Sequence, residues 1–238
     1  MKRKTKVLCW SLGVVIILLG IGLGVFKAKE YQPSSAATNA ATSAKITKKY
    51  TVFKGQSTKP AVIFYPGALV APNSYSVWAR QLAKHGYTVY LMHFPLDLAV
   101  LAGNRAAAVP TAARKNYVIG GHSLGGVMAS RYAAVHPKGL MGIFYLASYP
   151  DKKGSLKATT LPALSVTASR DGVLNWTSYR QSKHYLPAET QFVTLKGGNH
   201  AGFGSYGHQK GDHTATISTH RQQQLVETTL LQWLRQLK

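Results

Sequence analysis

A serine hydroxyl is a poor nucleophile until a neighbouring base removes its proton, and that base must itself be oriented by a third group. The 238-residue chain offers one set of these residue types in the expected places: Ser123, Asp171 and His200. Each follows a predicted strand, and their order along the chain, serine then acid then histidine, is a known order for such a triad. The sequence therefore predicts Ser123 as nucleophile, Asp171 as acid and His200 as base.

Ser123 lies in a glycine-rich turn between a predicted strand and a predicted helix. Residues 120–126 read GGHSLGG, which contains the pattern G-x-S-x-G. In this setting the serine is expected to have a strained backbone, and Gly121 and Gly125 leave room for the strand and the helix to approach closely. A purely structural glycine-rich turn is the alternative.

The predicted acid and base both stand where a strand ends. Residues 169–172 read SRDG, and residues 197–202 read GGNHAG. Because parallel strands bring their carboxyl ends to one edge of a sheet, Asp171 and His200 are expected to face Ser123. The glycine after Asp171 suits a tight turn, and the glycines around His200 allow its loop to fold over the edge.

Other acids and histidines compete for these roles. Asp151 is the alternative acid, because it follows the preceding strand; Asp212 lies in a loop and Glu227 in the last helix. No carboxylate–histidine spacing typical of a metal site is present, so no metal is predicted. The remaining histidines that we considered are expected at the surface or in packing: His85, His93, His122, His136, His208, His213 and His220.

Acyl transfer at Ser123 passes through an oxyanion that needs two backbone N–H donors. One should be Leu124, the residue after the nucleophile. The other should come from the loop after the strand AVIFY, where Ala68 is preferred over its neighbours Gly67 and Leu69.

Buried strands that alternate with helices must position these residues. The strands are continuous apolar runs, which indicates burial on both faces. The chain therefore predicts an α/β fold, a mostly parallel twisted sheet with helices on both faces. The expected strands are 61–65, 87–94, 117–121, 142–148, 163–168 and 191–196. The expected helices are 74–85, a weak helix over 96–113 broken at Pro110, 124–135, 175–185 and 218–237.

The N-terminus has the pattern of a membrane anchor. Residues 7–26 carry no charge and are mostly apolar, with four basic residues before them and two after. Twenty helical residues span about 30 Å, the hydrocarbon thickness of a bilayer. A single-pass signal anchor with a cytoplasmic N-terminus and an external body is expected; cleavage within the Ala-rich residues 36–44, giving a secreted body, is the alternative.

The chain divides into residues 1–30 (basic stub and anchor), 31–49 (flexible tether) and 50–238 (one globular domain). Its single cysteine, Cys9, excludes a disulfide or a Cys-ligated metal in the body. Beyond residue 30 the net charge is +17, which favours an anionic neighbourhood such as cell-envelope polymers. Nucleic acid is not expected as a partner, because no nucleic-acid-binding signature accompanies the charge.

The segments FYPGALVAPNSY, GGHSLGG, SRDG and GGNHAGFGSYGHQKGDHTATIS resemble α/β-hydrolases, and more narrowly the compact membrane-anchored cell-surface hydrolases of Gram-positive bacteria. The resemblance covers residues 50–238 and implies Ser123, Asp171 and His200 as the triad. It departs at residues 66–68, Pro-Gly-Ala, where many relatives have His-Gly.

These observations predict a serine hydrolase that works through an acyl-enzyme without metal or cofactor. Only about fourteen residues separate the strands ending near Ser148 and starting at Ala163, so any cap is minimal. Carboxylic esters, of a small molecule or a polymer, with small or exposed acyl groups are the expected substrates. An acyltransferase of the same fold and a non-enzymatic envelope-binding protein are the alternatives.

Overall fold

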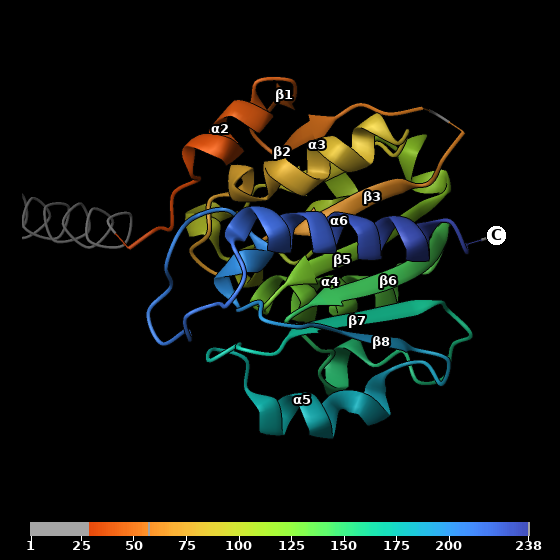
Figure 1. Cartoon of the computed structure of the whole chain (residues 1–238). Helices are drawn as coiled ribbons and strands as arrows, with labels where there is room; N and C mark the ends of the chain where they lie inside the picture. Colours follow the sequence, from red (N-terminus) through yellow and green to blue (C-terminus); the bar gives the residue numbers. More distant parts are fainter. Residues whose placement is uncertain (1–28, 57, 238) are drawn as a thin grey trace, which may run out of the picture. The chain divides into compact units, whose positions relative to one another are not determined.

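The computed structural model describes residues 29–56 and 58–237, and its centre is an eight-stranded sheet (Figure 1). The strands lie in the order β1-β2-β4-β3-β5-β6-β7-β8. From β4 to β8 neighbouring strands are parallel, whereas β1 and β2 add an antiparallel edge. The strands are β1 Lys45–Ile46, β2 Tyr50–Phe53, β3 Ala61–Tyr65, β4 Val89–Met92, β5 Tyr117–His122, β6 Leu140–Leu146, β7 Ala163–Ala168 and β8 Gln191–Leu195. The predicted mostly parallel sheet is confirmed.

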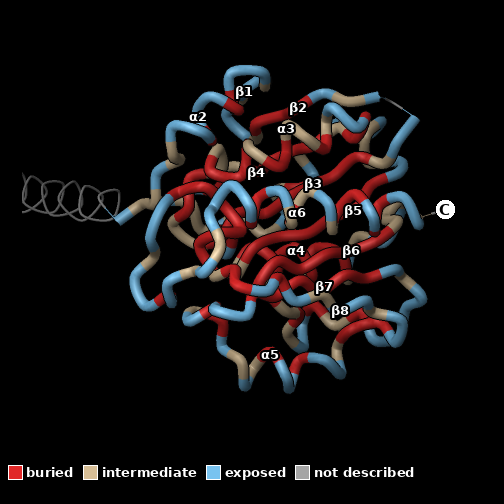
Figure 2. Tube along the Cα trace, viewed as in Figure 1, coloured by how far each residue is buried: buried red, intermediate tan, exposed pale blue. Residues whose placement is uncertain are grey.

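Both faces of the sheet are covered, which explains its continuous apolar strands. In β3 every residue is buried, and successive side chains point to opposite faces. Val62 and Phe64 join one hydrophobic cluster, while Ile63 and Tyr65 join another. Figure 2 shows the central strands as a buried layer inside an exposed shell.

The helices form the two outer layers. α3 (Ser76–Lys84) and α6 (Thr219–Leu234) insert Trp78 and Trp233 into the cluster with Phe64. α4 (Leu124–Val135) contributes Met128 and Tyr132 to the cluster with Ile63 on the opposite face. α5 (Trp176–Ser182) lies beyond β7 and β8 in Figure 1.

The prediction of a weak helix over residues 96–113 is wrong. The segment instead forms three short 3₁₀ turns, Pro95–Asp97, Ala99–Leu101 and Arg105–Ala108. Leu96 and Asp97 have positive φ angles of 53° and 50°, which an α-helix cannot contain. The segment is therefore a series of short turns, in which Ala99, Ala106 and Val109 are buried.

The flexible tether expected over residues 31–49 differs from the structure. Ser34 caps a short helix, α2 (Ser35–Ala41), whose residues Ala37, Ala40 and Ala41 are buried. Tyr31 pairs with the loop after β3, because its N–H donates to Leu69 O at 2.7 Å. The prediction of a flexible tether is wrong because the buried face of α2 consists of three alanines. Such a face is too weakly hydrophobic to produce a helical pattern in the sequence.

The predicted signal anchor, residues 7–26, lies outside the described residues. Among the residues that the structure does describe, no helix combines the length and the apolar character needed to cross a bilayer.

Candidate active site

Ser123 occupies the tight turn between β5 and α4 and has φ 51° and ψ −127°. This is a strained conformation for a non-glycine residue, as predicted. Glycines make the turn possible: a Cβ on Gly121 would overlap the backbone of Gly125, and one on Gly125 would overlap the carbonyl oxygen of Tyr65. The strand and the helix therefore approach each other too closely at this turn for a side chain at either glycine.

Backbone and side-chain bonds from β6 hold this turn in place. The Ser123 N–H donates to Leu146 O at 3.0 Å. The Oγ of Ser148, a buried residue just after β6, donates to Ser123 O at 2.6 Å. Ser123 itself remains partly exposed. Sequence reasoning does not find the bond from Ser148, because it depends on the register of β5 against β6.

Asp171 and His200 meet at the carboxyl ends of β7 and β8. The Nδ1 of His200 donates to Asp171 Oδ2 at 2.8 Å, and the two side chains are 1% and 0% exposed. The other carboxylate oxygen, Oδ1, accepts the backbone N–H groups of Val173 and Leu174 at 2.9 and 2.8 Å. The structure thus brings together the predicted acid and the predicted base.

The hydrogen bond to Asp171 selects one tautomer of the His200 imidazole. Because Nδ1 carries the donated proton, Nε2 of the neutral ring has a lone pair that can accept a proton. Nε2 is buried and has no hydrogen-bond partner among the described residues, so the bond from Ser123 Oγ is not formed in this structure. The ring of His122, the residue before Ser123, packs on the ring of His200 with centroids 4.4 Å apart.

Two buried glutamines of α6 hold the loop that carries His200. Gln222 accepts from Asn199 N at 3.0 Å and donates to Asn199 O at 2.7 Å. Gln223 donates to Gly202 O and Gly204 O, both at 2.8 Å. A Cβ on Gly202 would overlap the Gln222 side chain, which explains the glycine at that position. The side chains of α6 therefore position the loop that carries His200 by bonding to the main chain of that loop.

The loop after β3 leaves one of its three central amides open. The Gly67 N–H donates to Tyr75 Oη at 3.0 Å, and the Leu69 N–H donates to Asp97 O at 3.0 Å. The Ala68 N–H, between them, has no hydrogen-bond partner in the described part of the chain. Leu124 begins α4, so its N–H has no partner within the helix.

Tyr75 and His122 connect this loop to the nucleophile turn. Tyr75 Oη lies 2.9 Å from His122 Nδ1, and both residues are fully buried. Burial raises the pKa of Tyr75, so it remains a neutral hydroxyl. Burial lowers the pKa of His122 well below its usual 6.5, and the neighbouring His200 lowers it further. His122 was expected to serve packing; the structure adds a neutral hydrogen-bonding role.

The competing carboxylates lie elsewhere or have other partners. Asp151 accepts from Arg131 Nε at 3.0 Å and from the Gly154 N–H at 3.0 Å. Glu227 lies 3.7 Å from His85 Nε2. The carboxylate of Asp212 accepts backbone N–H groups. Within residues 29–56 and 58–237, no three or more His, Cys, Asp or Glu side chains gather in a metal-binding arrangement.

Comparison with known proteins defines the class. The model of the alpha/beta hydrolase family matches residues 61–224, so the chain belongs to the alpha/beta hydrolase family. No curated protein sequence matches the chain.

Solved structures share the fold at low sequence identity. An alpha/beta hydrolase from a sediment metagenome of the Mar Chica lagoon, Morocco, is 14% identical, with a TM-score of 0.60 over 81% of this chain and 97% of that one. Dienelactone hydrolase from Anabaena variabilis is 13% identical, with a TM-score of 0.58 over 79% and 91%. A membrane phospholipase A described as a bacterial virulence factor is 15% identical, with a TM-score of 0.58 over 99% and 100%.

The buried state of His122 predicts a pH dependence of stability. Its pKa is depressed in the folded protein and near 6.5 in the unfolded chain, so below pH 6.5 the unfolded state binds more protons. Folding stability is therefore expected to fall as the pH drops, by at most about 1.4 kcal/mol per pH unit from this residue. The free energy of unfolding is measured by urea denaturation of the wild type and of His122→Asn between pH 8 and 5. As the pH drops, this free energy should fall less steeply in the variant.

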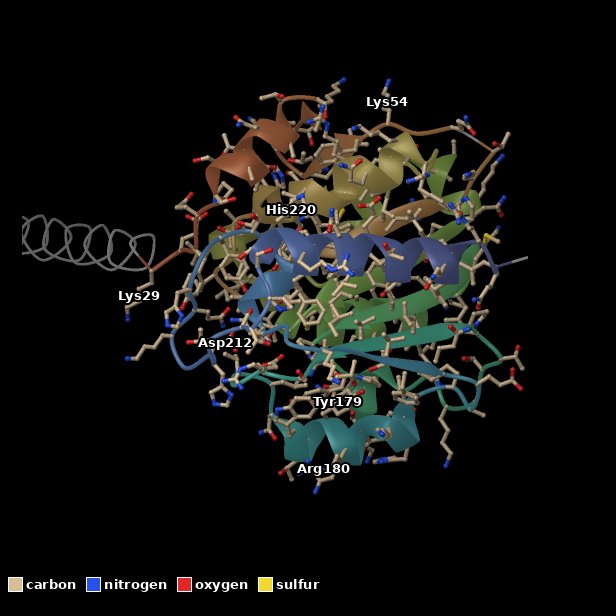
Figure 3. The ribbon with its side chains drawn as sticks, viewed as in Figure 1. Lys29, Lys54, Tyr179, Arg180, Asp212 and His220 are labelled. Carbon is tan, nitrogen blue, oxygen red and sulfur yellow. The ribbon has the colours of Figure 1, made fainter. Side chains whose placement is uncertain are left out.

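The matched control is His220→Asn, because His220 is exposed near the start of α6 (Figure 3). This variant should keep the wild-type slope. An identical slope in the wild type and His122→Asn would contradict the role of His122.

Proposed function

We propose that this protein is a serine hydrolase that cleaves carboxylic esters through an acyl-enzyme, with Ser123 as nucleophile, His200 as base and Asp171 as acid. The observation that carries the proposal is the buried hydrogen bond from His200 Nδ1 to Asp171 Oδ2, which leaves Nε2 free to accept a proton. The strained turn at Ser123 and the membership of the alpha/beta hydrolase family support it.

In the proposed reaction, the substrate brings Ser123 Oγ and His200 Nε2 within hydrogen-bond reach, as such contacts tighten in substrate complexes. Nε2 takes the hydroxyl proton while Oγ attacks the acyl carbon. His200 then gives that proton to the leaving alcohol, and an acyl-enzyme remains on Ser123. A water molecule, deprotonated in turn by Nε2, attacks the acyl-enzyme, and His200 returns that proton to Ser123 Oγ as the bond to the acyl group breaks and the acid is released.

The oxyanion formed in both steps needs two donors that are not already engaged. The N–H groups of Leu124 and Ala68 meet this condition, whereas those of Gly67 and Leu69 are bonded to other groups. Each such donor lowers the barrier by about 3 kcal/mol. We therefore assign the oxyanion hole to Leu124 and Ala68.

The segment between β6 and β7 limits the substrate. Residues 147–162 contain one 3₁₀ turn, Lys152–Gly154, and no helical lid. A site without a lid favours small acyl groups or acyl groups that remain exposed on a larger molecule. Neighbours of similar fold are described as a dienelactone hydrolase and a membrane phospholipase A, names that are compatible with this proposal.

The proposed location is the outer face of the cell membrane, with residues 7–26 as a single-pass anchor helix. Support comes from the uncharged run and from its more basic N-terminal flank. The net charge of +17 beyond residue 30 is complementary to anionic envelope polymers.

Substitution of the triad tests the enzyme. Ser123→Ala should lower the turnover of short p-nitrophenyl esters by more than about 10⁴-fold, because it removes the nucleophile. Asp171→Asn should lower kcat by about 10³- to 10⁴-fold, because His200 loses the acceptor that fixes its tautomer. A fluorophosphonate probe should label Ser123 in the wild type, as peptide mass spectrometry will show.

Asp151→Asn is the matched control for the acid. It removes the same charge from the other strand-end carboxylate, whose partners are Arg131 and Gly154, and should keep kcat within twofold of wild type. Wild-type turnover in Ser123→Ala would refute the enzyme, and loss of activity in Asp151→Asn but not in Asp171→Asn would reassign the acid.

Protease treatment of intact cells tests the location. The full-length protein, tagged at its C-terminus, should be digested by externally added protease while a cytoplasmic marker survives. A body that is protected in intact cells and digested only after lysis would contradict the external orientation.

A further inference from the structure

Asp212 is a buried carboxylate whose bonds in the structure all come from backbone N–H groups. It is 9% exposed. Its Oδ1 accepts from the N–H groups of Gly172 and His213, each at 3.0 Å, and its Oδ2 accepts from the Ala201 N–H at 2.9 Å. No Lys, Arg or His of the described chain forms an ion pair with it. Burying a carboxylate without a cationic partner costs free energy, which the three hydrogen bonds offset only in part. The burial of Asp212 therefore calls for an explanation.

Two of the donors are the immediate neighbours of the acid and the base. Gly172 follows Asp171, and Ala201 follows His200. One side chain thus bridges the turn after β7 and the loop after β8, at the points where they carry the Asp171–His200 pair. Figure 3 shows Asp212 at the end of the sheet where these two segments emerge.

Asp212 belongs to a strap, residues 204–217, that runs over this end of the sheet. On one side the Ser205 N–H donates to Ser74 O at 2.7 Å. On the other side the Thr216 N–H donates to Gly197 O at 2.8 Å, and Arg170 Nε donates to Thr214 O at 2.6 Å. The strap is therefore fixed on both sides of Asp212, which limits how far the carboxylate can shift.

The geometry requires a carboxylate. Three N–H donors point at the two oxygens, so both oxygens must be acceptors. An asparagine has one acceptor oxygen, and its NH₂ group would face either the Ala201 N–H or the pair from Gly172 and His213. A buried donor that loses its acceptor is destabilised, so one of the two loops would move.

We propose that Asp212 is a positioning residue, which holds the acid turn and the base loop in the register that the Asp171–His200 hydrogen bond needs. This inference rests on the proposed serine hydrolase. Asp212 acts through the main chain of the two loops and touches no reacting atom. Its removal should slow the chemical step and leave substrate binding largely unchanged.

The test compares Asp212→Asn and Asp212→Glu with Asp151→Asn, a matched loss of charge at a carboxylate whose partners are Arg131 and the Gly154 N–H. Steady-state kinetics on a short p-nitrophenyl ester and the rate of fluorophosphonate labelling are measured on folded, full-length protein in detergent. Asp212→Asn should lower kcat and the labelling rate by about 10- to 100-fold, as small misplacements of catalytic groups do, with KM within twofold.

Asp212→Glu keeps both acceptor oxygens and should recover part of the rate, whereas Asp151→Asn should match the wild type. A kcat of Asp212→Asn within twofold of wild type would overturn the proposal. So would a loss that Asp151→Asn shares, because it would then reflect general destabilisation. If near-ultraviolet circular dichroism shows that Asp212→Asn does not fold, Asp212→Glu decides: a folded protein with reduced kcat supports the role, and one with wild-type kcat refutes it.

The failure of this inference differs from the failure of the proposed function. Activity that survives Ser123→Ala would refute the serine hydrolase itself. Activity that requires Ser123 but is indifferent to Asp212 would refute the positioning role alone.

Discussion

The hydrogen bond between Asp171 and His200 is the interaction on which the rest of this site depends. It joins two polar side chains that are almost completely removed from water, and such groups are stable only when their hydrogen bonds are satisfied. The parallel register of β7 against β8, in which Ala168 lies opposite Leu195, brings the two loops side by side. The sheet brings Asp171 and His200 close together, and backbone amides supply the remaining hydrogen bonds of the Asp171 carboxylate.

The two halves of the site are built in different ways. The proposed acid and base, Asp171 and His200, lie in irregular loops. Hydrogen bonds from the amides after Asp171, from buried glutamines of α6 and from Asp212 hold these loops in place. Ser123 is held by a strained turn that close packing of glycines permits. Rigid positioning of this kind is what a general base and an oxyanion hole require, because a misplaced group loses most of its effect.

The sequence predicted the parts of the structure that have local signatures. The alternating apolar strands and helices gave the sheet, and the motifs around Ser123, Asp171 and His200 placed the acid and the base together. It did not predict α2, whose buried face is only alanine, or the 3₁₀ turns after β4, which depend on positive φ angles. From the sequence, Asp212 is only a carboxylate in a loop. Its bonds to Gly172 and Ala201 join segments that come together only in the folded chain.

A crystal structure of the fluorophosphonate adduct would show whether Ser123, His200 and Asp171 act together, because the phosphoryl group stands in for the tetrahedral intermediate. We expect phosphorus bonded to Ser123 Oγ and His200 Nε2 within hydrogen-bond distance of an adduct oxygen. We also expect a phosphoryl oxygen that accepts from the N–H groups of Leu124 and Ala68. An adduct at another serine would refute Ser123 as the nucleophile. An adduct at Ser123 with the imidazole of His200 turned away and its bond to Asp171 broken would refute the roles of His200 and Asp171.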